Sequence, residues 1–330
     1  MSTKATNFTL CKGDVLGFYD TWEQPDCIVS DGPYGLGIYP GEPRSTKDLE
    51  AFYRPHIAKW SQCAKPSTTL WFWNTEVGWA SVHNLIDSYG WKYETCHVWD
   101  KGIGHVAGNV NGSSIRRFPV TTEVCVFYSR APVVQTDDGP REMKQWLREE
   151  WKRSGLPLSI ANEACNVGNA ATRKYLTQCH LWYFPPGSMV VKLANYAKKN
   201  GKPTDKPYFS LDGKTEITEE AWDSQRYVWN HEHGMTNVWK EPSLHGEERV
   251  KCNGETLHCN QKPLSLMKKI LNACTQAGDV IWEPFGGLCS TSLAALEIGR
   301  RPFAAEVLPT YHDAGKKRLS SFVAMNARGR

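Results

Sequence analysis

Apolar residues gather in short runs along the chain, and turn residues bound each run. Six of these runs are rich in β-branched and aromatic residues, which is typical of buried strands. The predicted strands cover residues 26–31, 68–73, 93–99, 122–129, 279–285 and 302–307.

Longer segments between or after these runs space their apolar residues as one face of a helix does. They predict helices over residues 47–64, 76–90, 263–278 and 290–299. Strands that alternate with helices of this length indicate βα units. We therefore predict an α/β fold with a doubly wound, mostly parallel, Rossmann-like sheet.

The strand signal fades in the middle of the chain, where charged helical segments and Pro/Gly turns take over. Residues 141–155 predict one amphipathic helix that ends at Gly155, a glycine of the C′ type. We predict a mainly helical insert over residues 131–235, between two parts of the sheet domain at 1–130 and 236–330.

Composition narrows the class of protein. The 330 residues can bury a core, and their net charge of +4 permits a nucleic-acid partner without requiring one. The N-terminus does not resemble a signal peptide, and the eleven cysteines are scattered without a Cys-x-x-Cys pair. We expect reduced thiols and a cytoplasmic protein.

We predict no metal site, because the clusters of His and Cys at 231–233 and 252–259 lack the paired spacing of zinc ligands.

The first predicted strand ends in the turn Asp31-Gly32-Pro33-Tyr34. Taken alone, it could be an ordinary surface turn. As a site, it would let Asp31 and the Pro33 carbonyl accept the two hydrogens of an amino group. The Tyr34 ring would then supply a face for a planar base.

A second strand end, at 283–291, holds a Gly-Gly turn before a helix, and the next strand ends on Glu306. A tight βα turn would also explain the glycines. With an acid one strand later, however, the pattern favours a nucleoside site, in which Glu306 accepts both ribose hydroxyls and the helix N-terminus offers free N–H groups. A nicotinamide dinucleotide is disfavoured, because the loop lacks Gly-x-Gly-x-x-Gly.

Together, the two turns resemble motifs of the DNA amino-methyltransferases that use S-adenosylmethionine. That family's catalytic motif is Asp/Asn/Ser-Pro-Pro-aromatic, and its cofactor loop is commonly Asp-Pro-Phe-x-Gly-Ser-Gly-Thr. A third family element, His-Pro-x-Gln-Lys-Pro, has its counterpart at 258–263. The catalytic motif precedes the cofactor loop, which is the permuted order of the β class. The chain departs from the pattern at Gly32, Glu283 and Leu288-Cys289.

The resemblance implies a catalytic half at 1–130 and a cofactor-binding half at 236–330. It implies S-adenosylmethionine as cofactor, double-stranded DNA as partner, base flipping and a restriction-modification setting. A cognate restriction endonuclease and a homodimer are further expected partners. The implied catalytic residues are Asp31, Pro33 and Tyr34. The implied cofactor contacts are Asp14, Lys262, Phe285, Gly286, Gly287, Ser290, Thr291 and Glu306.

Residues 158–176 suggest a helix-turn-helix within the insert, with Ala164 as the packing alanine and Gly168 as the turn glycine. A packing unit of three helices is an equal alternative. The second helix would present side chains suited to base edges and phosphates, namely Asn169, Thr172, Arg173 and Lys174.

The leading acid Asp31, where cytosine-N4 enzymes usually carry serine, favours adenine N6 as the target amine. Cytosine N4 is the alternative within the same fold. A DNA-binding protein with an inactive methyltransferase core, and a methyltransferase of RNA or of a protein amide, are alternatives of other classes.

Overall fold

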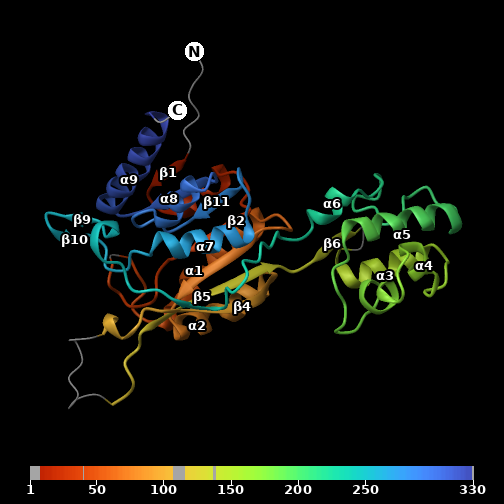
Figure 1. Ribbon diagram of the computed structural model, residues 1–330, viewed down its shortest axis with the longest axis horizontal. Helices are drawn as coiled ribbons and strands as arrows, with labels where there is room; N and C mark the ends of the chain where they lie inside the picture. Colours follow the sequence, from red (N-terminus) through yellow and green to blue (C-terminus); the bar gives the residue numbers. More distant parts are fainter. Residues whose placement is uncertain (1–7, 40, 107–115, 137–138, 329–330) are drawn as a thin grey trace. The chain divides into compact units, whose positions relative to one another are not determined.

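The structure is a computed structural model that describes residues 8–39, 41–106, 116–136 and 139–328. The chain divides into two compact units (Figure 1). The sheet unit comprises Met1–Arg130 and Tyr227–Arg330, and the helical unit comprises Ala131–Arg226. Among the described residues, no helix has the length and apolar composition needed to cross a bilayer.

One sheet organises the sheet unit. Its strand order is β1-β12-β11-β2-β3-β5-β4-β8. The first five strands in this order are parallel, β5 is antiparallel to both of its neighbours, and β8 is parallel to β4. The strands are β1 (Thr9–Lys12), β2 (Cys27–Ser30), β3 (Thr69–Asn74), β4 (Trp91–Asp100), β5 (Thr122–Arg130), β8 (Val238–Lys240), β11 (Val280–Glu283) and β12 (Arg301–Glu306). The predicted mostly parallel α/β sheet is confirmed, and all six predicted strands are present.

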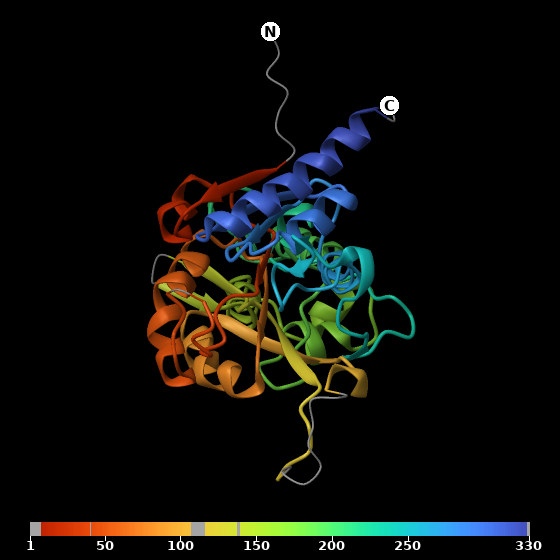
Figure 2. The same ribbon diagram turned by 90° about the vertical axis from the view of Figure 1, so that its left-hand side faces the viewer.

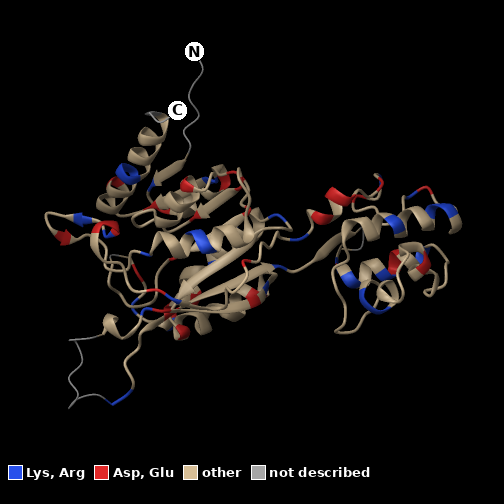
Figure 3. Ribbon diagram, in the orientation of Figure 1, with Lys and Arg blue, Asp and Glu red and all other residues tan. Residues whose placement is uncertain are grey.

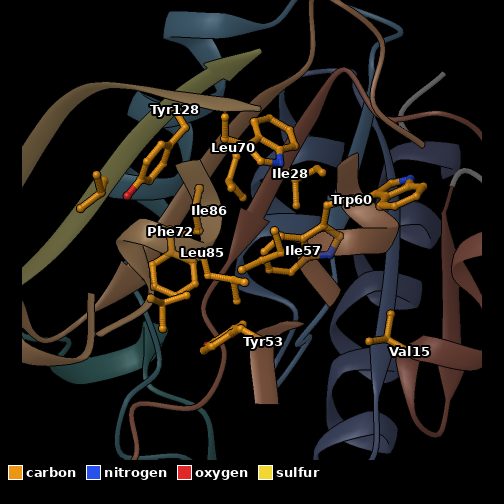
Figure 4. Packing of buried hydrophobic residues seen from close by; sticks show 14 of the residues in the cluster. Val15, Ile28, Tyr53, Ile57, Trp60, Leu70, Phe72, Leu85, Ile86 and Tyr128 are labelled. Carbon is orange, nitrogen blue, oxygen red and sulfur yellow. The ribbon is translucent and has the colours of Figure 1, made fainter. Parts of the chain in front are cut away.

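Helices cover both faces of this sheet, because alternate strand residues point to opposite sides. Leu70 and Phe72 of β3 lie in a core with α1 (Leu49–Cys63) and α2 (Glu76–Ser88), part of which Figure 4 shows. Trp71 and Trp73 lie in the opposite core, under α7 (Leu264–Cys274) and α8 (Ser290–Glu297). The last helix, α9 (Pro309–Arg328), packs against α8 and β1 (Figure 2). All four predicted helices of the sheet unit are present.

Short elements complete the sheet unit. They are the 3₁₀ turns η1 (Val15–Gly17), η2 (Tyr19–Thr21), η3 (Thr46–Asp48), η4 (Ile103–His105) and η6 (Gly246–Glu248), and the hairpin of β9 (Lys251–Cys252) and β10 (Glu255–Thr256).

The helical unit has its own core, in which Trp146, Trp151 and Trp222 are buried. Its elements are β6 (Val133–Thr136), β7 (Gly139–Glu142), α3 (Met143–Arg153), α4 (Ile160–Cys165), η5 (Ala171–Tyr175), α5 (Gly187–Asn200) and α6 (Glu219–Asp223). Gly155 follows α3 with φ +73°, the left-handed conformation that a C′ glycine adopts.

The helical unit ends at Arg226, earlier than the insert boundary predicted at 235. The reason lies in two aromatic side chains that follow it. Tyr227 and Trp229 both pack on Phe127 of β5, with ring centroids 5.3 and 5.1 Å away. These ring contacts assign this part of the chain to the sheet unit.

Candidate functional site

A cavity of about 530 Å³ lies at the carboxyl ends of β2, β11 and β12. Parallel strands bring their carboxyl ends to one edge of a sheet, which is where ligands bind in open α/β folds. Seven predicted site residues line this cavity, namely Asp14, Asp31, Pro33, Tyr34, Phe285, Gly287 and Glu306. The other four predicted cofactor residues, Lys262, Gly286, Ser290 and Thr291, line an adjoining cavity of about 40 Å³ that also includes Asp31.

Asp31 belongs to a buried network of charged groups, which we call the ion network: Asp31, Tyr34, Lys101, Glu123 and Lys262. Lys262 Nζ lies 2.7 Å from Asp31 Oδ1 and 3.2 Å from Glu123 Oε2. The Tyr34 hydroxyl lies 3.0 Å from Asp31 Oδ1 and 3.1 Å from Glu123 Oε2, and Lys101 pairs with the other oxygen of Glu123. Two lysines therefore balance two carboxylates beside the cavity.

The ion network shifts the pKa values of Glu123, Lys262 and Tyr34. Burial alone would raise the pKa of Glu123, but Lys262 and Lys101 outweigh it and lower this pKa to about 2. Burial would lower the pKa of Lys262, yet the two carboxylates raise it. Burial and the same carboxylates raise the pKa of the Tyr34 hydroxyl, which stays protonated. Since this hydroxyl has one proton, it donates to Asp31 or to Glu123 at any moment.

Two roles expected of the turn Asp31-Gly32-Pro33-Tyr34, the predicted catalytic turn, do not match the geometry. The Pro33 carbonyl already accepts hydrogen bonds from the Tyr53 hydroxyl at 2.9 Å and Asn74 Nδ2 at 3.1 Å, which uses both of its lone pairs. Tyr34 is only 8% exposed, so its ring offers little face for stacking. Within the described part of the chain, no hydrogen bond reaches the carbonyl of Gly32, which also lines the cavity.

Close packing explains the glycine that replaces the family's first proline. A Cβ on Gly32 would lie 2.5 Å from a ring carbon of Phe285 and 2.7 Å from the Tyr53 hydroxyl. Both neighbours pack against the core, so neither can move away cheaply. The glycine therefore lets the Phe285 ring approach the catalytic turn.

Glu42 holds the loop that follows the catalytic turn. Its Oε1 accepts from the backbone N–H of Tyr34 at 3.0 Å and of Leu36 at 3.4 Å. Its Oε2 accepts from the N–H of Ile38 at 2.8 Å and of Tyr39 at 3.2 Å. One carboxylate thereby fixes the loop and presents Leu36 and Ile38, each 53% exposed, at the cavity.

The cofactor loop is organised by two buried acids. Glu283 Oε1 and Oε2 accept from the backbone N–H groups of Thr291 and Ser292, both at 2.9 Å, and burial raises the pKa of Glu283 to about 7. Glu306 accepts from the N–H groups of Gly287 and Leu308, both at 2.7 Å. Two of the helix N–H groups that we expected to be free for a ligand are thus taken by Glu283.

Cys289 adopts φ +56°, a left-handed conformation that glycine adopts more readily. It stands where the family motif has its small residues. The buried Cys289 side chain packs against Gly315 of α9, where a Cβ would approach Cys289 Sγ to 2.6 Å. Gly315 therefore accommodates this departure from the motif.

Several residues of the site were missed by sequence reasoning. They include Glu123, Lys101, Glu42, Tyr53 and Asn74, and a cluster at the cavity formed by Tyr39, His258 and Tyr311. His258 opens the third family element, which is a signal in the sequence that pointed to this cluster. Burial lowers the pKa of His258 to about 4.

The helical unit differs from the expected helix-turn-helix. The left-handed residue of the turn is Asn166, with φ +54°, and Gly168 lies in a bend two residues later. The second helix is one π-helical segment, Ala171–Tyr175. Within it, the Thr172 N–H donates to Asn162 Oδ1 at 3.2 Å, and the Thr172 hydroxyl accepts from Asn162 Nδ2 at 3.1 Å. Asn169, Arg173 and Lys174 are exposed. Acidic and basic residues are interspersed along this unit (Figure 3), and Arg141 and Arg153 pair with Glu149 and Glu150.

A mostly parallel sheet with a cavity at the carboxyl ends of its strands is typical of the α/β proteins that bind nucleosides. A family model of DNA methylases, of the N6/N4 type, matches residues 25–317. The chain therefore belongs to the N6/N4 DNA methylase family.

The individual curated relatives match shorter parts of this chain than the family model does. The DNA adenine methyltransferase YhdJ of Escherichia coli (strain K12) is 28% identical over 125 residues, which are 35% of this chain and 41% of that protein. The chain spans less than half the length of the curated relatives it matches.

Two solved structures share the fold over most of their length. M1.HpyAVI, solved as its SAM complex, is 15% identical with a TM-score of 0.52, covering 94% of this chain and 98% of that chain. The PvuII DNA methyltransferase, described as cytosine-N4-specific, is 12% identical with a TM-score of 0.53, covering 95% of this chain and 88% of that chain.

Proposed function

We propose that this chain transfers a methyl group from S-adenosylmethionine to an exocyclic amine of a flipped DNA base, with adenine N6 as the target. The observation that carries the proposal is the placement of Asp31. Its Oδ1 is held by Lys262 and Tyr34, and its side chain remains 22% exposed at the cavity. A carboxylate fixed at one oxygen has its other oxygen, Oδ2, available to a substrate.

The cavity fits the proposed cofactor in size and chemistry. Its volume of about 530 Å³ lies within the range of small-molecule sites. Glu306, with each oxygen anchored by one backbone N–H, retains acceptor capacity for the two hydroxyls of a ribose. Phe285, Val15 and Leu308 give apolar walls, and Asp14 lies on the loop after β1. When bound, the cofactor supplies an electrophilic methyl group on a sulfonium.

The chain's own groups would orient the amine. Asp31 Oδ2 and the Gly32 carbonyl are two acceptors that this turn offers at the cavity, and they replace the expected pair of Asp31 and Pro33. Two acceptors on one amino group turn its lone pair out of conjugation with the base and toward the methyl group. Asp31 Oδ2 also receives the proton that the nitrogen loses on methylation. Base flipping costs a few kcal/mol, which contacts in the cavity would offset.

Two observations favour adenine over cytosine. The catalytic turn begins with an acid and not with the serine usual in cytosine-N4 enzymes. YhdJ, which is named as an adenine methyltransferase, shares local sequence with this chain, whereas the PvuII enzyme shares the fold at 12% identity. Cytosine N4 remains the alternative. The packing reason for Gly32 speaks against a decayed, inactive core.

The helical unit is proposed to read the DNA sequence. Asn169, Arg173 and Lys174 are exposed and carry the donors that base edges and phosphates accept. Thr172 is bonded within the unit, so we propose a supporting role for it. A partner endonuclease and a homodimer stay predictions.

Transfer of labelled methyl from S-adenosylmethionine to unmethylated duplex DNA tests the proposal. We expect the wild type to label DNA and Asp31→Ala to lose transfer while calorimetry still shows cofactor binding. Asp87→Ala, on the exposed side of α2, is the matched control and should transfer normally. Near-normal transfer by Asp31→Ala would remove Asp31 from this role.

A further inference from the structure

A second cavity, of about 360 Å³, lies beside the active site within the sheet unit. It is lined by residues from the end of β4, from η4 and from the segment 243–261. It shares Lys101 and Glu123 with the ion network and Asn260 with the active-site cavity. Glu123, which lines this cavity, lies 3.1 Å from the Tyr34 hydroxyl, and that hydroxyl lies 3.0 Å from Asp31.

The lining of this cavity is cationic. Lys101, Arg249 and Lys251 are set against Glu123, which is the one carboxylate among its lining residues. The charge of Glu123 is already balanced by Lys262 and Lys101, and no carboxylate of the described residues forms an ion pair with Arg249 or Lys251.

Hydrogen bonds fix two of the donor side chains that line the cavity, Arg249 and His105. Arg249 Nη1 donates to the carbonyls of His258 at 3.0 Å and Cys259 at 2.9 Å, which fixes the guanidinium and leaves its other N–H groups for a ligand. His105 Nδ1 is held by Ser243 Oγ at 3.0 Å, so its other ring nitrogen is available. Among the described residues, Lys251 has no carboxylate within ion-pair distance. A rigid, donor-rich, cationic cavity is the environment that an anion requires.

Neighbouring acids do not cancel this character. Glu247, Glu248 and Glu255 belong to the same segment, but none of them lines the cavity. Glu248 accepts the backbone N–H of Leu264 at 2.7 Å, so its carboxylate is used at the start of α7.

We infer that this cavity binds a phosphate of the DNA strand that carries the flipped base. The inference rests on the proposed function. A base that enters the active-site cavity brings its own sugar and phosphates to the rim, and the cationic cavity adjoins that rim through Asn260. Arginine, lysine and amide donors are the groups that position a DNA backbone.

Lys251→Ala tests this assignment, because Lys251 is exposed and its truncation should leave the fold intact. Binding of a short duplex is measured by fluorescence anisotropy between 0.05 and 0.2 M salt. Loss of one phosphate contact should reduce the slope of log affinity against log salt by about 0.9 and weaken binding about fivefold at 0.15 M salt. The KM for DNA should rise by the same factor with kcat unchanged, since the contact is made equally in the ground and transition states.

The matched control is Lys92→Ala. Lys92 is an exposed lysine at the start of β4, and it lies about 30 Å along the strand from Lys101 of the cavity. This variant should bind DNA as the wild type does. An equal slope and affinity for Lys251→Ala and the wild type would overturn the inference.

Inorganic phosphate titrated alone distinguishes a small-anion site from a DNA contact. Phosphate binding that Lys251→Ala removes, together with an unchanged DNA slope, would also overturn the inference. A wild type that neither binds DNA nor transfers methyl would instead overturn the proposed function, so the two failures are distinguishable.

Discussion

Replacing Lys262 by methionine removes a cation that pairs with both Asp31 and Glu123. The ammonium lies 2.7 Å from Asp31, 3.2 Å from Glu123 and 3.1 Å from the Tyr34 hydroxyl, and its side chain is 3% exposed. Methionine fills a similar volume without charge. The two carboxylates would then face each other across Tyr34 with Lys101 as the remaining cation.

The expected loss of stability can be worked from Glu123. Its pKa of about 2 lies below the ordinary value of 4.5, a difference worth about 3 kcal/mol at neutral pH, part of which Lys101 retains. Breaking a buried ion pair by removing one partner costs about 3–5 kcal/mol, so we expect a loss of about 3 kcal/mol. Because the pKa of Glu123 is depressed in the folded state, this stabilisation is fully present above about pH 4.5 and disappears as the pH falls toward 2. The difference between wild type and variant should therefore narrow below about pH 4.5.

Urea unfolding followed by tryptophan fluorescence measures the stability, and calorimetry with S-adenosylmethionine measures cofactor affinity. If Lys262 positions Asp31, the variant should lose stability and methyl transfer while cofactor affinity changes little. Lys262→Arg, which keeps the charge, should recover part of both. An unfolding free energy within about 0.5 kcal/mol of the wild type, together with weakened cofactor binding, would refute this reasoning and return Lys262 to the cofactor contacts predicted from the sequence.

Three further changes test other parts of the site. Gly32→Ala should cost about 1–3 kcal/mol and weaken cofactor binding by displacing Phe285, and unchanged thermal unfolding would contradict the close packing. Glu42→Gln should lower methyl transfer about tenfold, since an amide can replace only part of four hydrogen bonds to a carboxylate; an unaffected kcat would separate loop geometry from catalysis. The raised pKa of Glu283, about 7, means that the folded state binds its proton more tightly than the unfolded state, so this group destabilises the fold as the pH rises from about 4.5 to 7. Glu283→Gln should remove about 3 kcal/mol of that pH dependence, and parallel stability profiles for variant and wild type would contradict it.

The strands and helices of the sheet unit were predictable because their apolar residues follow the periods of buried elements. β2 and β3 are buried throughout, and helices close around them on both faces. The strands β1 and β8 were missed, because short edge strands bury too few residues to show a period. The end of the helical unit was misplaced, because Tyr227 and Trp229 join the sheet unit through ring contacts that no local pattern signals.

At the site, the sequence placed residues at the correct edge of the sheet but not their contacts. Asp31 and Lys262 are 231 residues apart, and only the folded sheet brings them to 2.7 Å. The sequence predicts the Pro33 carbonyl as a substrate contact. The groups that donate to it, Tyr53 and Asn74, lie on other elements, so the sequence around Pro33 does not indicate that they occupy it. Hydrogen-bond saturation of this kind depends on tertiary packing, so local sequence does not reveal it.

The most direct test of the central claim is nucleoside analysis of DNA treated with the wild type and labelled S-adenosylmethionine. We predict that the label appears in N6-methyladenine, and that Asp31→Ala gives none while it still binds the cofactor. Label in N4-methylcytosine would contradict the choice of adenine. No labelled nucleoside from a wild type that demonstrably binds the cofactor would contradict the account as a whole.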